Sequence, residues 1–367
     1  MATCGFFADW AEMGIRSVKK LRIGYVPNSK NLDAPGDRRR IVFWAKARGH
    51  EIITNLDDKF DVLVLSERSD LGFFVNREIN VPIIFDLVDG YLARESLAKD
   101  WFRGTSKVVT RQLSGIPKPF TQFVQDMCIT ASAVICSSPE QSELIAKYSK
   151  NVHVILDSHD EIPWLEFQGK ENELKTKRYL LWEGLPVTLG GVKAIIPTLI
   201  HENRKYGTGI KFVTDQKYHR LLGQYFPAST AKLLSNLLGP MSCDTELTSW
   251  NVENLVSSAK VSHAAIIPVM LSNKLQYFKP ENRLLIMWKL ALPTIVSAIP
   301  SYTRVSNISG SDIVSKDNSE WAEKLNLLHN QEYAEDLVRR GQDYLKTNHT
   351  KEILLLKWDN AVQSVLI

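Results

Sequence analysis

The residues best suited to binding chemistry stand together at the start of one stretch, residues 279–302. Lys279, Asn282 and Arg283 surround the first turn of a predicted helix. Pro280 suits that turn, because its missing N–H would have no helical partner there in any case. Apolar residues then recur at helical spacing, namely Leu284, Leu285, Trp288 and Leu292. A helix start offers free N–H groups and the positive end of the helix dipole, so two cations beside it suit a diphosphate.

The same stretch ends in a strand and a loop. Pro293 stops the predicted helix, and the β-branched run 294–296 is typical of a buried strand. Ser301 and Tyr302 follow the strand. Their hydroxyl and backbone N–H groups either reach a bound diphosphate or form a plain surface turn.

This order of polar start, helix, proline and strand resembles the donor-binding segment of family 4 glycosyltransferases, which have the GT-B fold. The matching residues are Lys279, Arg283, Leu284, Leu285, Met287, Pro293, Val296 and Ser297. The resemblance implies an α/β protein with two Rossmann-like domains facing across a cleft, and a final helix that returns to the first domain. It also implies that the second domain binds a nucleotide sugar. An ordinary helix–strand unit with an exposed charged end is the alternative explanation.

The sequence departs from that family at two acidic positions. Family members carry two glutamates eight residues apart that bind the donor sugar and ribose, and Phe278 and Ile286 stand at those positions here. Glu281 is nearby, but its spacing is wrong. Either the donor is held differently, or the site no longer catalyses transfer.

Two further segments resemble donor-binding parts of the family. Glu183 and Gly184 follow the predicted strand 179–182, where the family has a glycine loop that touches the diphosphate; a simple glycine turn is the alternative. Trp250 precedes a predicted helix, and its ring is suited to stacking on a nucleobase. A tryptophan of the hydrophobic core is the alternative.

The first domain offers candidates for binding the acceptor. Asp37, Arg38 and Arg39 open the helix after the first strand, where they suit an anionic acceptor, a lipid diphosphate or an anionic membrane surface. A solvated helix face is the alternative. Asp86 and Asp89 follow a buried strand, and either could accept a proton or hydrogen bond from an acceptor hydroxyl.

His159 lies where the two predicted domains join, so it could hydrogen-bond the transferring sugar or serve as a plain junction residue. We predict no metal site, because no His/Cys cluster accompanies these carboxylates and the resemblance implies metal-independent transfer. No cofactor is expected beyond the nucleotide-sugar substrate.

The elements that must position these residues alternate between strand and helix, which indicates parallel sheets covered on both faces. Strands are predicted at 21–26, 51–54, 61–65, 82–85, 133–136, 152–156, 179–182, 210–214, 263–268 and 294–296. Helices are predicted at 37–48, 120–130, 139–148, 190–203, 229–238 and 251–259, with helical structure throughout 319–367. A polar stretch near 157–177 reads as a linker. We therefore predict domains at 1–165 and 166–350, with 351–367 as the returning helix.

Length and composition fit this organisation. The chain of 367 residues exceeds what one core usually holds, and 44% hydrophobic with 23% charged residues is ordinary for a globular protein. A net charge of +4 is too small to indicate nucleic-acid binding. The four cysteines show no CxxC motif, which suits a reducing compartment.

The N-terminal residues do not follow the pattern of a signal peptide, since Asp9 and Glu12 interrupt the apolar part. No apolar run approaches the ~20 residues that span a bilayer. We expect a cytoplasmic protein, with peripheral contact at the inner membrane face as a further expectation. Apolar residues at helical spacing (Phe6, Trp10 and Met13) predict a short amphipathic helix near the N-terminus, which packs on the protein or on a membrane.

The predicted function is transfer of a sugar from a nucleoside-diphosphate sugar to a glycan or lipid-linked acceptor in polysaccharide biosynthesis. The resemblance implies retention of configuration. A scaffold that binds a sugar nucleotide or a protein partner without turnover is the main alternative, and the missing carboxylates favour it. A sugar-nucleotide epimerase is a third possibility, for which few clustered carboxylates and histidines are available.

Overall fold

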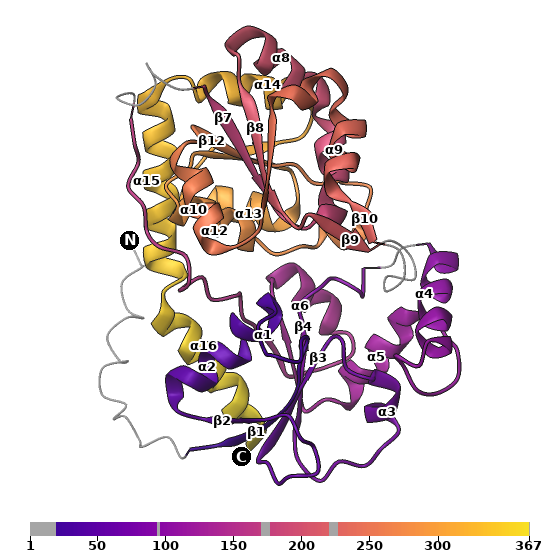
Figure 1. The fold of residues 1–367 in the computed structure, drawn as a ribbon. Coiled ribbons are helices and arrows are strands. Elements are labelled where there is room, and N and C mark those ends of the chain that lie inside the picture. The colour runs from indigo at the N-terminus through magenta and orange to yellow at the C-terminus, as the bar shows by residue number, and fades with distance from the viewer. Residues whose placement is uncertain (1–19, 94–95, 170–176, 220–226, 367) are drawn as a thin grey trace, which may run out of the picture.

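The computed structural model describes residues 20–93, 96–169, 177–219 and 227–366. They form two lobes, each built on a parallel six-stranded sheet with helices around it (Figure 1). This confirms the predicted α/β architecture of two Rossmann-like units. The amphipathic helix predicted around Phe6, Trp10 and Met13 lies outside the described residues.

The first sheet has the strand order β2-β1-β3-β4-β5-β6, and all its pairs are parallel. Its strands are β1 (Arg22–Val26), β2 (Glu51–Ile53), β3 (Val62–Ser66), β4 (Ile83–Leu87), β5 (Ala133–Cys136) and β6 (Val152–Val154). The helices of this lobe are α1 (Pro35–Arg38), α2 (Ile41–Arg48), α3 (Leu71–Val75), α4 (Leu97–Val109), α5 (Phe120–Thr130) and α6 (Pro139–Ile145). Strands β3, β4 and β5 are buried along their whole length, as expected where helices cover both faces.

The second sheet has the order β11-β8-β7-β12-β13-β14 and is also parallel. Its strands are β7 (Tyr179–Glu183), β8 (Gly209–Thr214), β11 (Thr245–Ser249), β12 (Ala264–Ile267), β13 (Thr294–Ser297) and β14 (Val314–Ser315). A separate antiparallel pair consists of β9 (Lys217–His219) and β10 (Pro227–Ser229). The helices are α7 (Gly190–Ala194), α8 (Ile196–Tyr206), α9 (Thr230–Leu238), α10 (Val252–Lys260), α11 (Lys274–Tyr277), α12 (Asn282–Lys289), α13 (Pro300–Ser309), α14 (Asn318–Leu327) and α15 (Gln331–Asn348).

The last helix, α16 (Lys351–Leu366), lies against the first lobe, so the chain crosses between the lobes a second time (Figure 1). Trp358 is buried and stacks on Trp44 of α2, with 6.0 Å between ring centroids. Asp359 accepts a hydrogen bond of 2.7 Å from the Trp44 indole nitrogen and pairs with Arg48.

The prediction of one continuous helix over residues 37–48 is wrong, because the helix is interrupted. The chain forms α1 and α2 with a break at Arg39 and Arg40, and Arg40 has a non-helical backbone (φ −121°, ψ −111°). The break turns Arg40 into the lobe, where its side chain is fully buried, while Arg38 remains part-exposed. The helix predicted at 190–203 is likewise divided, at Ile195.

Helices α12 and α15 pack closely enough to require a glycine. A Cβ atom at Gly341 would overlap the buried ring of Trp288. We therefore expect Gly341→Ala to lower the free energy of unfolding by about 1–3 kcal/mol, the usual cost of overpacking. Urea unfolding measures it, with Glu335→Ala on the exposed side of α15 as control. Equal stability of the two variants would contradict this packing.

Candidate functional site

The two lobes meet through the loops that follow their strands. Lys279 of the second lobe pairs with Asp89 of the first, with 2.9 Å between Nζ and Oδ1. Gln141 of α6 donates a 3.3 Å hydrogen bond to the Phe278 carbonyl. The structure thus brings the start of α12 to the contact between the lobes, next to the loop after β4. This is where ligands bind in open α/β sheets.

The Lys279–Asp89 pair is only part-exposed, with 35% and 29% of the side chains accessible. Asp89 raises the pKa of Lys279. The Asp89 N–H donates a 3.0 Å hydrogen bond to Glu67, whose pKa is raised by burial and by the Asp89 charge. Glu67 was not predicted, although it follows β3 just as Asp89 follows β4, and that position was the available signal.

Arg283 is the second residue of α12 and faces the end of β7. Its guanidinium lies over the Trp182 ring, 5.1 Å from the centroid, and donates to the Glu183 carbonyl. Its Nε is buried, lies 3.6 Å from a Glu183 carboxylate oxygen and makes no hydrogen bond among the described residues. Gly184 is required here, because its φ is +152° and an added Cβ would lie 3.0 Å from Arg283 Cζ.

Trp250 reaches the same place from the end of β11. Its indole N–H donates a 2.9 Å hydrogen bond to Glu183. The guanidinium groups of Arg38 and Arg39 each lie 5.4 Å from its ring centroid. In this conformation the ring therefore contacts arginines of the other lobe, where we had predicted a nucleobase.

Glu161 fixes the two arginines. It accepts hydrogen bonds of 2.7 Å from Arg38 and 2.6 Å from Arg39. Burial opposes its ionisation, but the two guanidinium groups lower its pKa overall. Glu161 lies in the segment between the lobes, and sequence reasoning did not select it because its partners are over 120 residues away.

Two predicted acidic residues have structural partners instead of facing the gap. Asp37 is fully buried and accepts five hydrogen bonds from Tyr25, Asn28 and Ser29, so it holds the loop after β1. Asp86 is buried, and both its oxygens accept from Arg40, at 2.8 and 2.6 Å. The prediction that these two bind an acceptor is therefore corrected, since their oxygens are already taken up by the chain.

His159 lies between the lobes and is buried. Its ring centroid is 5.3 Å from that of His349, which ends α15, and its carbonyl accepts a 2.8 Å hydrogen bond from Lys289. Asn282, the first residue of α12, accepts a 3.4 Å bond from the Asp157 N–H beside this pair. Burial is the main cause that lowers the pKa of both histidines, that of His349 to about 4.

These buried neutral histidines predict acid sensitivity. The unfolded chain takes up a proton at His349 below pH ~6.5, whereas the folded chain does not until about pH 4, so stability falls as the pH falls through that window. The free energy of unfolding should fall between pH 7 and 5.5, and we expect His349→Asn to make that fall smaller by about 1 kcal/mol. Urea unfolding at both pH values measures it, with exposed His201→Asn as control. An unchanged slope would exclude His349 as a source.

Ser301 and Tyr302 begin α13 and are both 2% exposed. The Ser301 hydroxyl donates a 2.7 Å hydrogen bond to the Lys279 carbonyl, and burial raises the pKa of Tyr302 to about 12. Neither side chain lies on the surface, so the structure gives Ser301 a part in holding the backbone of Lys279.

A second ion cluster across the lobes was not predicted. Arg304 of α13 pairs with Glu140 of α6 at 2.8 Å and with Glu281 at 3.0 Å. Glu281 is 1% exposed, and its pKa is raised by burial against the opposing charge of Arg304. The carboxylate next to the expected diphosphate site is therefore already partnered by an arginine.

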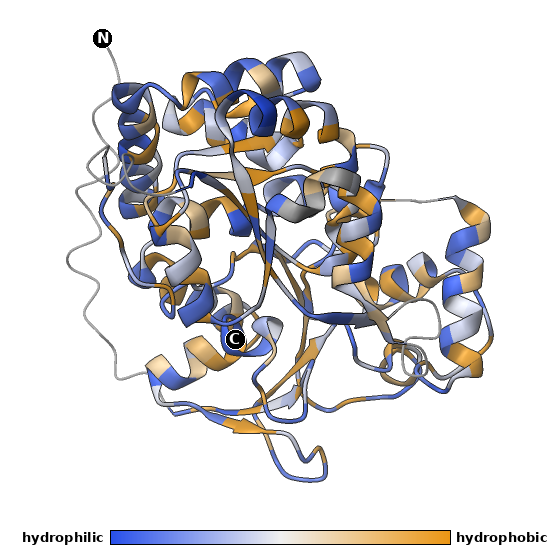
Figure 2. Cartoon of the chain, turned by 45° about the horizontal axis from the view of Figure 1, so that its top comes forward, coloured by the Kyte–Doolittle hydropathy of each residue, from blue (hydrophilic) through white to orange (hydrophobic). Residues whose placement is uncertain are grey.

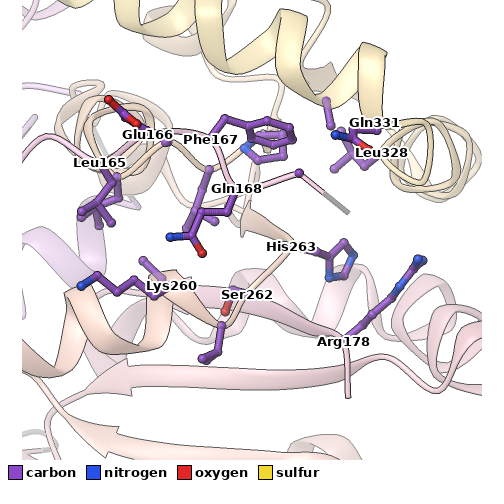
Figure 3. A pocket seen from close by; sticks show the side chains of 18 of the residues that line it. Leu165, Glu166, Phe167, Gln168, Arg178, Lys260, Ser262, His263, Leu328 and Gln331 are labelled. Atoms are coloured by element: carbon purple, nitrogen blue, oxygen red, sulfur yellow. The ribbon is translucent and has the colours of Figure 1, made fainter. Parts of the chain in front are cut away.

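A cavity of about 320 Å³ lies at the other end of the second sheet (Figure 3). Its lining includes Arg178, His263 and Pro293, which directly precede β7, β12 and β13, so it opens at the amino ends of the strands. None of the predicted site residues lines it. Within the described residues, no three His, Cys, Asp or Glu side chains are grouped to hold a metal ion, and no helix is long and apolar enough to cross a membrane.

Comparison with known proteins shows which folds this architecture resembles. No protein-family model and no curated protein sequence matches the chain. Solved structures do. A glycosyltransferase from Rickettsia africae has a TM-score of 0.60 and 10% identity over 95% of this chain and 99% of its own. WaaG, a glycosyltransferase involved in lipopolysaccharide biosynthesis, has a TM-score of 0.57 and 11% identity over 93% and 98%.

A mutant of S. aureus TarM, in complex with Fondaparinux, alpha-GlcNAc-glycerol and UDP, has a TM-score of 0.54 and 10% identity over 82% of this chain. The match covers 55% of TarM, so this chain spans little more than half of its length. At such identities the likeness shows the fold alone, and the fold of this chain is GT-B.

Proposed function

We propose that this protein is a glycosyltransferase that moves a sugar from a nucleoside-diphosphate sugar to a glycan or lipid-linked acceptor in glycan biosynthesis. The observation that carries the proposal is the position of Lys279, Asn282 and Arg283. They lie around the N-terminus of α12, where the loops of the two GT-B lobes meet. Two structures of this fold are named as glycosyltransferases and a third, that of TarM, contains UDP, and these support the proposal.

In the proposed mechanism the departing nucleoside diphosphate takes the place of Asp89 on Lys279. Lys279, Arg283 and the free N–H groups of α12 stabilise the negative charge that develops as the glycosidic bond breaks. Gly184 leaves room for the Arg283 guanidinium, and Glu183 keeps that guanidinium oriented. Asp89, released from Lys279, becomes the hydrogen-bond acceptor for the attacking hydroxyl, with Glu67 beside it.

The lobes must separate before a donor can enter. Trp250 becomes available to a nucleobase only when Arg38 and Arg39 withdraw, and the freed arginines then suit an anionic acceptor. Closure around both substrates excludes water and brings the hydroxyl to the anomeric carbon. Retention of configuration and independence from metal remain predictions that rest on the resemblance.

A sugar-nucleotide-binding protein without turnover is the second candidate. Two observations favour it. The cations of the site lie beside carboxylates of the same chain, Lys279 with Asp89 and Arg283 with Glu183. Ile286, at one position where the family carries glutamate, is 2% exposed and belongs to the hydrophobic core.

One experiment separates the candidates. The purified protein is incubated with a panel of UDP-, GDP-, ADP- and dTDP-sugars, with and without EDTA, and released nucleoside diphosphate is measured beside calorimetric binding. We expect slow release from one donor, unaffected by EDTA. Binding without release under any acceptor would support the non-catalytic candidate, and absence of both would reject the proposal.

A further inference from the structure

Helix α4 packs on its lobe with its polar side inward. Arg103 and Lys107 point toward the lobe, where Arg103 lies 5.6 Å from the Tyr91 ring centroid and Lys107 5.1 Å from that of Phe120. Gly104 is buried against the backbone of Lys118. These contacts leave the opposite side of the helix to face outward.

The outward side is apolar. Leu97, Trp101, Phe102 and Val109 are 69%, 45%, 58% and 74% exposed, and Ile116 in the following loop is 84% exposed. Scattered exposed apolar residues are ordinary, but a continuous set on one helix marks an interaction surface. Figure 1 shows α4 as an outer element of the first lobe, on the side opposite α15 and α16, and Figure 2 shows hydrophobic residues along it.

Basic residues accompany this apolar surface. Residues 96–118 contain five basic residues and one acidic residue, of which Arg103 and Lys107 face the lobe and Lys118 pairs with Asp126. Lys99 and Arg111 are exposed beside the apolar side chains. Two copies of such a segment would repel each other, which disfavours self-association through it. An apolar face with an aromatic residue and flanking cations suits the surface of an anionic bilayer.

We infer that α4 and the loop to Lys118 bind an anionic lipid surface, with the helix lying in the plane of the interface. This differs from our expectation that Arg38 and Arg39 attract a membrane, since both are paired with Glu161. It also stands apart from sugar transfer, because lipid binding needs neither donor nor acceptor.

Flotation of the full chain with vesicles tests the inference. The vesicles contain phosphatidylcholine alone or mixed equally with phosphatidylglycerol. We expect the chain to float with the anionic vesicles, and its partitioning into neutral ones to be at least tenfold weaker. The double variant W101S/F102S should lose at least tenfold in partitioning. Its control is I308S/L356S, which removes two residues of α13 and α16 that are 59% and 56% exposed.

Charge is tested in the same assay. Lys99→Glu should weaken partitioning at least about fivefold, since one basic residue near an anionic surface contributes ~1 kcal/mol. Lys232→Glu, an equally exposed charge reversal on α9, should change it little. Equal binding to neutral vesicles, or full binding by W101S/F102S, would overturn the inference. So would a dimer that W101S/F102S converts to a monomer, because the surface would then belong to a second copy.

Discussion

Replacing Arg40 with leucine is expected to lower the free energy of unfolding by about 3–5 kcal/mol, the usual cost of removing one partner from a buried ion pair. Arg40 is fully buried and holds both oxygens of Asp86, one oxygen of Asp157 at 3.1 Å and the Ile155 carbonyl at 2.8 Å. Without it, Asp86 remains 3% exposed with no counter-ion. The midpoint of urea unfolding measures the loss.

The pH dependence of this variant gives a second readout. Burial raises the pKa of Asp86 against the opposing charge of Arg40, so removal of Arg40 raises it further. The buried carboxyl then takes up a proton more readily than in the unfolded chain, and the deficit should shrink as the pH is lowered.

Two controls separate the buried cluster from a general loss of arginine. Arg48→Leu removes an arginine of α2 whose pair with Asp359 is part-exposed, and it should cost about 1 kcal/mol or less. The double variant R40L/D86L should recover part of the stability, because Asp157, with 11% of its side chain exposed, is then the one charge of the cluster left without its partner. If Arg40→Leu lowers the free energy of unfolding no more than Arg48→Leu does, the buried cluster contributes little to stability.

Arg283→Ala is expected to weaken nucleoside diphosphate binding by about 1.5–3 kcal/mol, the range for hydrogen bonds to charged groups, or roughly 10- to 150-fold in Kd. The side chain is 20% exposed, and its buried Nε has no hydrogen-bond partner among the described residues, so a phosphate oxygen that reached it would meet a free donor. Calorimetric titration with UDP and GDP measures the change.

The matched variants are chosen for charge and geometry. Arg283→Lys keeps the charge but loses the planar guanidinium group, so its Kd should lie between those of the wild type and Arg283→Ala. Arg204→Ala removes an exposed arginine in the last turn of α8, near the amino end of β8, and should leave Kd unchanged. Equal affinity of Arg283→Ala and the wild type would remove Arg283 from the site.

Local sequence patterns were enough for much of the fold. The strand at 133–136 and the helix at 120–130 begin and end at the predicted residues, because each is a continuous or periodic apolar run with clear boundaries. Helix α4 was not predicted, and its apolar side faces outward instead of joining the core. Strand β11 was missed because its residues, Thr245–Ser249, are mostly polar and only partly buried.

The site was predicted as a set of residues and not as a set of contacts. Lys279, Arg283, Glu183, Trp250 and Asp89 do come together, since each follows a strand or opens a helix at the same edge. Their partners could not be predicted, because they depend on side chains far away in sequence. The three consecutive arginines show this: a break in the helix directs Arg40 to Asp86 in the core, while Arg38 and Arg39 turn to Glu161.

The contact between His159 and His349 has a mechanical consequence. The two chain segments that join the lobes, the one around residue 159 and the α15–α16 turn, touch at this pair of rings. Because these two connections lie side by side, we expect the lobes to open about one axis through this contact, with less freedom to twist. The space between the lobes should then widen most at the edge farthest from the two connecting segments. Cleavage of one connecting segment would leave the lobes joined by the other.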